Sequence, residues 1–107
     1  MKYRVVVQPC ALQDLDDAFS WAAGHAPETA WRWLERFQVG IAGLARFPLR
    51  CGYAPENDLF EPEIRQYLFG RRSSVFRVLF TVRGEEVHVL HIRRATMSMA
   101  KPEDLGL

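Results

Sequence analysis

The stretch VFRVLFTVRGEEVHVLHIRR, residues 75–94, decides the fold because it reads as two β-strands joined by a tight turn. Both halves are rich in Val, Leu, Ile and Phe, and the residues between them, 83–85, are polar around Gly84. A glycine at this position supplies the backbone freedom that a short hairpin turn requires. We therefore predict an antiparallel hairpin.

Side chains alternate between the two faces of a strand, and this alternation assigns the faces of the hairpin. In the first strand, one face carries Phe76, Val78, Phe80 and Val82, and the other carries Val75, Arg77, Leu79 and Thr81. In the second strand, the same rule places Leu90 and Ile92 on one face and Val89 and His91 on the other. We expect the face of Phe76 to pack on helices, which leaves Arg77 on the opposite face and outside the core. Because Leu79 shares that face, something else is expected to cover it.

Upstream of the hairpin, the sequence predicts a strand and two helices. Residues 2–8 are a short β-branched run, and Pro9 suits the first turn of a helix. This helix should end at Gly24, and a second should open at Pro27 and end before Pro48. The apolar residues recur at helical spacing: Ala11, Leu12, Leu15, Ala18, Phe19 and Ala22, then Ala30, Trp33, Leu34, Phe37, Ile41 and Leu44. Since the connection between the helices is short, they should form an antiparallel hairpin.

The rest of the chain completes an α+β fold. Residues 48–63 hold three prolines and a glycine and are predicted to be a loop, and a further strand follows at 64–70. The order is then β-α-α-β-β-β, a small antiparallel-rich sheet with a helical hairpin packed on one face. A chain of 107 residues fits one domain, which we expect to span residues 1–107 with a flexible tail at 95–107.

Several classes of protein and site are disfavoured. The apolar runs are too short for a membrane span, and the N-terminus lacks the features of a signal peptide, so a cytoplasmic protein is expected. Cys10 and Cys51 form no CxxC and should be free thiols. The histidines are not spaced with the cysteines as a ligand set, so no metal site is expected. No P-loop, dinucleotide fingerprint or nucleophile elbow occurs, and no cofactor is expected.

The charge is unusual in its composition rather than in its size. The formal net charge is only +1, but twelve of the fourteen basic residues are arginine, and seven of these lie between Arg65 and Arg94. Arginine makes planar, bidentate contacts with phosphate or carboxylate that lysine does not make. The cluster therefore predicts either a site for such groups or an arginine-biased solvated surface.

The order of these features resembles the RelE/ParE superfamily of toxins from bacterial type II toxin–antitoxin systems. The matching residues run almost end to end: Pro9, Ala11, Asp14 and Leu15, then Ile41, Leu44, Phe47 and Pro48, Gly52, Ile64 and Arg65, the FRVLF motif at 76–80 and the VLHIRR motif at 89–94. The details are more similar to the ParE-like, plasmid stabilisation branch than to the RelE-like branch.

This resemblance implies a small cognate antitoxin that wraps the toxin and holds it inactive. It also implies two kinds of target, because RelE-like members are ribosome-dependent mRNA endonucleases and ParE-like members inhibit DNA gyrase without cleaving nucleic acid. A homodimer or a toxin–antitoxin hetero-oligomer is the expected assembly. Trp21 and Trp31 lie off the apolar stripes of the helices and are expected to be partly exposed. Core packing or contact within the helical hairpin is the favoured role of each, and contact with an antitoxin or a second subunit is the alternative.

A ribonuclease must activate a 2′-hydroxyl, stabilise charge on the phosphate and protonate the leaving oxygen. RelE-like toxins do this with basic residues on the open sheet face and a tyrosine or histidine near the C-terminus. By this resemblance the catalytic candidates are Arg65, Arg77 and His91. However, the paired lysines of the family are absent, no tyrosine follows Tyr67, and a net charge of +1 suits a ribosome poorly. An enzyme is therefore the less favoured interpretation.

The favoured interpretation is a ParE-like toxin that inhibits its target by binding. A basic surface near the strand ends, formed by Arg65, Arg77, Arg93 and Arg94, would bind the target or the antitoxin, and the partner would cover Leu79. Arg71 and Arg72, in the turn before the hairpin, are further binding candidates. The alternatives are the ribosome-dependent ribonuclease and a non-toxic relative that serves only as an antitoxin-binding module.

Overall fold

The computed structural model describes residues 2–70, 75–97 and 99–105. Its order of elements is the predicted one, and the strands form one sheet in the order β1-β4-β3-β2. The strands are β1 (Arg4–Val7), β2 (Arg65–Phe69), β3 (Phe76–Arg83) and β4 (Glu86–Arg94). β1 runs parallel to β4, whereas β2, β3 and β4 pair antiparallel. The predicted α+β, antiparallel-rich sheet is confirmed.

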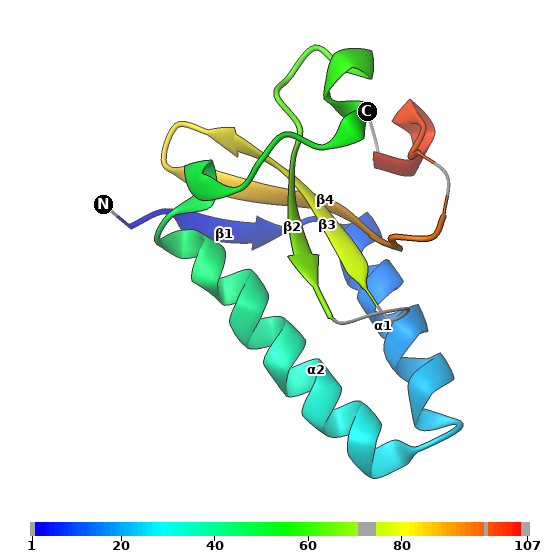
Figure 1. Ribbon diagram of the computed structural model, residues 1–107. Coiled ribbons are helices and arrows are strands. Elements are labelled where there is room, and N and C mark those ends of the chain that lie inside the picture. Colours follow the sequence, from blue (N-terminus) through cyan, green and yellow to red (C-terminus); the bar gives the residue numbers. More distant parts are fainter. Residues whose placement is uncertain (1, 71–74, 98, 106–107) are drawn as a thin grey trace.

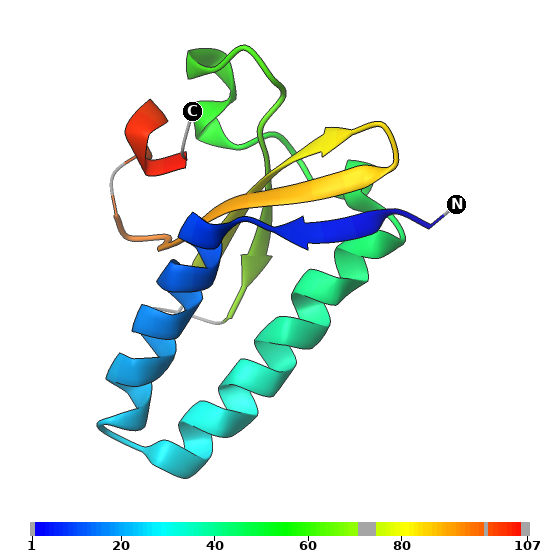
Figure 2. The same ribbon diagram turned by 180° about the vertical axis from the view of Figure 1, so that it is seen from behind.

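The two long helices cover one face of this sheet (Figures 1 and 2). They are α1 (Pro9–Ala23) and α2 (Pro27–Ala42), and each has a proline in its first turn, where the missing N–H has no intrahelical partner to lose. Their buried residues pack on the even-numbered side chains of β3, as predicted. This core consists of Ala11, Leu15, Phe37, Ile41, Leu44, Phe76, Val78, Phe80, Val87, Val89 and Ile92. No helix in the described part of the chain is long and apolar enough to cross a membrane.

The opposite face of the sheet is covered by the chain itself, whereas the sequence predicted that a partner would cover it. The segment between the helices and β2 forms the 3-10 helices η1 (Gly43–Ala45), η2 (Pro48–Arg50) and η3 (Pro55–Leu59), and η5 (Pro102–Leu105) follows β4. Figure 1 shows η3 and η5 on the side of the sheet away from α1 and α2. Between them lies a second apolar cluster of Ala54, Ile64, Leu79, Leu90, Ala100 and Leu105.

This second cluster corrects the prediction that a partner covers Leu79. Leu79 is fully buried inside the chain, so it is not left for a partner to cover. In the tail, which was expected to be flexible, Ala100 and Leu105 are 1% and 3% exposed and pack in this cluster. Local patterning does not reveal that two irregular segments, distant in the chain, meet over the same sheet face.

A register shift in the β3–β4 pair corrects a second prediction. Leu79 pairs with His91 and the next residue, Phe80, pairs with Val89, so Leu90 is the extra residue of a bulge. Strict alternation put Ile92 on the face of Leu90. With the bulge, Val89 and Ile92 both reach the helix side, while Leu90 packs with Leu79 in the second cluster. The predicted turn at Gly84 is confirmed, since Gly84 has a φ of 59° in the connection between β3 and β4.

Candidate functional site

The arginines that were predicted to form one basic surface are divided between the two faces of the sheet. Arg77 pairs directly with Arg93, on the face of Leu79, while Arg94 pairs with Phe76 and Arg65 with Phe80, on the helix side. Directly paired residues of neighbouring strands point to the same face. The prediction that Arg65, Arg77, Arg93 and Arg94 form one common surface is therefore wrong. Arg71 and Arg72 lie outside the described residues.

Arg77 is buried in an ion pair with Glu56 of η3. Its side chain is 8% exposed and that of Glu56 is 0% exposed. Arg77 donates from Nη1 to Glu56 Oε1 at 2.8 Å and from Nη2 to Oε2 at 2.7 Å, and Nη1 also donates to Gln66 Oε1 at 3.1 Å. Ala100 N–H donates to Glu56 Oε2 at 2.8 Å. The pair thus joins the sheet, the loop and the tail, and neither charge is presented to solvent.

The ionised form of Glu56 is favoured by these partners. Burial alone would raise the pKa of Glu56, but the hydrogen bonds from Arg77 and Ala100, with the charge of Arg77, outweigh it and lower the pKa to about 2. The carboxylate is therefore charged at neutral pH. No local motif marked Glu56, although a charged residue on an apolar strand such as Arg77 calls for an acidic partner somewhere in the chain.

Arg65 contacts the segment that precedes η3. Nη1 donates to the carbonyl oxygen of Cys51 at 2.6 Å, and the guanidinium lies 4.4 Å from the ring centre of Tyr53. Its side chain is only 15% exposed. These contacts hold the η2–η3 segment to the edge strand β2, and they leave little of the guanidinium free to meet a ligand.

His91 and Arg93 share a face, as predicted, and lie next to acidic groups from two other segments. Arg93 Nη1 is 3.3 Å from His91 Nε2 and 3.4 Å from Asp104 Oδ2. Asp14 of α1 places Oδ2 2.6 Å from His91 Nδ1 and accepts a hydrogen bond of 3.0 Å from Ile92 N–H. Since β1 pairs with β4 only as far as Val89, Asp14 caps part of the strand edge that β1 leaves uncovered.

A surface cleft opens beside His91, and its lining is of mixed charge. The lining residues are Asp14, Asp17, Phe76, His91, Ile92, Arg93, Arg94, Met97 and Asp104. The hydrogen bond from Lys101 N–H and the positive charge of Arg93 lower the pKa of Asp104, so this carboxylate is ionised. The three acidic side chains of the cleft outnumber its two arginines, and this balance disfavours an RNA phosphate there because like charges repel at short range.

Arg94 is exposed, and it borders an apolar pocket near the turn that joins α1 to α2. Its guanidinium lies 5.2 Å from the ring centre of Trp21 and 5.6 Å from that of Phe76. Trp21 is 60% exposed and Trp31 is 58% exposed, as expected from their positions off the apolar stripes. The pocket is lined by Ala18, Trp21, Ala22, His25, Ala26, Thr29, Ala30, Trp33, Phe76 and Arg94. We call this set the Trp21–Arg94 pocket.

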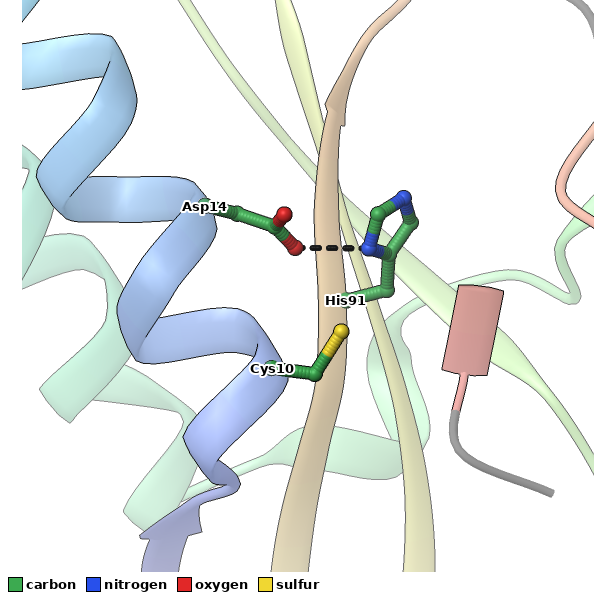
Figure 3. A group of neighbouring side chains, drawn as sticks. All are labelled: Cys10, Asp14 and His91. Atoms are coloured by element: carbon green, nitrogen blue, oxygen red, sulfur yellow. Dashed lines mark ion pairs between the residues drawn. The ribbon is translucent and has the colours of Figure 1, made fainter. Parts of the chain in front are cut away.

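Cys10, Asp14 and His91 form a cluster that the sequence did not reveal (Figure 3). One ligand atom from each residue lies within 4.8 Å of the other two. Desolvation, together with the charges of Asp14 and Asp104, raises the pKa of the Cys10 thiol. The thiol is therefore not an activated nucleophile, although a cysteine, a histidine and an aspartate are adjacent. Spacing along the chain could not show this cluster, because the fold brings β4 to the first turns of α1.

The elements and the sheet define the class of fold: a helical hairpin on a mixed sheet, as expected for a RelE/ParE-like protein. Among solved structures, the chain is similar to a chain of the chromosomal ParDE TA system from P. aeruginosa, with a TM-score of 0.71 and 21% sequence identity. The similarity covers 87% of this chain and 96% of that chain. It confirms the ParE-like fold. No protein-family model and no curated protein matches the sequence.

Proposed function

We propose that this chain is a ParE-like toxin of a type II toxin–antitoxin pair, which inhibits a cellular target by binding it and is neutralised by a cognate antitoxin. DNA gyrase is the first target to test, because the resemblance to ParE-like toxins implies it. The fold of the chromosomal ParDE TA system supports the assignment to this kind of system.

The burial of Arg77 is the main observation that favours a toxin acting by binding over a ribonuclease. A RelE-like ribonuclease needs its arginines on an open sheet face, where they stabilise charge on the phosphate. Here that face is filled by the loop and the tail, and Arg77 is neutralised by Glu56. Arg65 points to the other face and is bonded to Cys51, and His91 lies between Asp14 and Arg93. The three catalytic candidates therefore do not converge on one accessible point.

The Trp21–Arg94 pocket is the surface best suited to a protein partner. Aromatic residues and arginine are enriched where proteins bind one another, especially where they surround an apolar depression. The pocket combines an exposed tryptophan, an exposed arginine and a mainly apolar lining. We propose that this surface contacts the target, and that the antitoxin acts by covering it.

The proposal is tested by a DNA supercoiling assay with purified gyrase and the purified chain. We expect the wild-type chain to inhibit supercoiling, and Trp21→Ala and Arg94→Glu each to raise the inhibitory concentration at least about tenfold, as for an interface hot spot of about 1.4 kcal/mol or more. Arg83→Glu is the matched control, since it makes the same charge change at the turn end of the hairpin. It should inhibit like the wild type.

Two results would count against this account. If Trp21→Ala and Arg94→Glu inhibit as fully as the wild type, the pocket is not the surface that binds gyrase, although the chain is still an inhibitor. No inhibition by the wild-type chain, when a known gyrase inhibitor acts in the same assay, would remove gyrase as the target.

A further inference from the structure

The ligand atoms of Cys10, Asp14 and His91 are positioned from two rigid elements. Cys10 and Asp14 are four residues apart on α1, so their side chains lie on one face of the helix, and His91 reaches them from β4 (Figure 3). Helical ligands at this spacing are common in metal sites because both can reach one ion. The three atoms are within 4.8 Å of one another, so a small rotation of the exposed Cys10 side chain would complete a set around one ion.

His91 supplies a second, independent observation. The residue is 9% exposed, and its Nδ1 atom is buried without a hydrogen-bond partner of proper geometry among the residues that the structure describes. Asp14 Oδ2 is only 2.6 Å from this nitrogen, but the contact lacks hydrogen-bond alignment. A metal ion bound at Nδ1 would give this buried atom an aligned partner, which the contact with Asp14 does not provide.

The charges around the cluster favour a cation. Asp17 and Asp104 add to Asp14 at the adjoining cleft, and the carbonyl oxygen of Asp104 accepts a hydrogen bond from Cys10 Sγ at 3.2 Å. Of the two arginines that line the cleft, Arg94 lies over Trp21, and Arg93 is held by Asp104. The lining of the cleft thus carries three acidic side chains and two arginines, and both arginines have other contacts.

We propose that Cys10, Asp14 and His91 bind a divalent transition-metal ion, and that zinc is the ion best matched to them. A thiolate, an imidazole and a carboxylate are ligands that zinc accepts in a tetrahedral site, whereas Mg²⁺ and Ca²⁺ prefer oxygen ligands alone. The fourth position of such a site is left for water or for a group from a partner. Binding releases the thiol proton of Cys10 to solvent and places the imidazole proton on His91 Nε2, so the contact from Arg93 must give way.

The site is tested by titrating Co²⁺ into the reduced, metal-free full chain and recording absorption from cobalt–thiolate charge transfer, followed by displacement with Zn²⁺. We expect one ion per chain, and loss of the charge-transfer band in Cys10→Ser. Asp14→Asn and His91→Gln should weaken Zn²⁺ binding, measured by calorimetry, at least about tenfold, because even groups that only support a ligand cost about that much.

Cys51→Ser and His25→Gln are the matched controls, since both residues lie outside the cluster. Each should bind like the wild type. Cys10 is exposed, so Cys10→Ser should fold even if a change at the buried His91 does not, and circular dichroism checks this. The proposal is overturned if the wild-type chain shows no charge-transfer band, or if Cys51→Ser removes the band and Cys10→Ser keeps it. Neither result bears on gyrase inhibition, which is measured separately.

Discussion

At the scale of single residues, Arg77 and Glu56 show why an arginine is tolerated within an apolar strand. Burying two charges costs several kcal/mol per ion, and good geometry is needed to offset that cost. Here the contact is bidentate, and further hydrogen bonds to Gln66 and from Ala100 satisfy both groups. The pair therefore fastens η3 and the tail to the sheet.

Breaking this pair should be costly. We expect Arg77→Met to lower the free energy of unfolding by about 3–5 kcal/mol, because it leaves Glu56 buried and charged without its partner. The double variant Glu56→Leu/Arg77→Met should lose less than the sum of the two single changes. Urea unfolding at neutral pH measures these values.

The control for this measurement is Arg4→Met. Arg4 also pairs with a carboxylate, that of Glu86, but its side chain is 75% exposed. Exposed pairs contribute about 0–1 kcal/mol, so this change should have little effect. A loss for Arg77→Met as small as that for Arg4→Met would contradict the structural role given to Arg77.

The lowered pKa of Glu56 predicts a dependence of stability on pH. The folded-state pKa of about 2 is below the ordinary value of 4.5, so ionised Glu56 contributes stability at neutral pH that is lost as the pH falls from 4.5 through about 2. The loss should be roughly 3 kcal/mol, since one pKa unit corresponds to about 1.4 kcal/mol. Glu56→Gln should be less stable at pH 7 and should flatten this part of the curve. An unchanged acid limb in Glu56→Gln would show that other carboxylates cause it.

At the scale of elements, the helices and most strands follow from the sequence because each depends on a local period. The proline starts of α1 and α2, the face of Phe76 and the turn at Gly84 were all predicted. The bulge at Leu90 was not predicted, because it interrupts the alternation on which the prediction depended. One bulge was enough to move Ile92 to the other face.

The contact between α2 and β2 depends on a glycine. At Gly40, an added Cβ atom would overlap the ring and hydroxyl of Tyr67, which packs against the helix. We expect Gly40→Ala to destabilise the fold by about 1–3 kcal/mol, because the ring must move. Gly43→Ala is the matched control: it has a helical φ of −61° and open space around it, so it should be neutral or stabilise by up to about 1 kcal/mol. Thermal unfolding compares them, and a more stable Gly40→Ala would contradict this packing.

At the scale of the whole molecule, the two faces of the sheet have different roles. The helix side holds the larger core and, at the end of β4, the exposed pocket, while the opposite side is closed by the chain itself. The sequence indicated the arginines but could not assign them to faces or partners, because Glu56, Asp14 and Asp104 come from segments distant in the chain. Those contacts give Arg77 and Arg93 acidic partners within the chain.

The most direct test of this account is 5′-end mapping of cellular mRNA soon after the chain is induced without an antitoxin, with growth followed in parallel. A toxin that binds its target should stop growth and leave messages intact, and Arg94→Glu should restore growth while Arg83→Glu should not. New mRNA ends at codon-phased positions, appearing with the wild-type chain, would contradict the account, because they would require a ribonuclease site that the buried Arg77 does not provide.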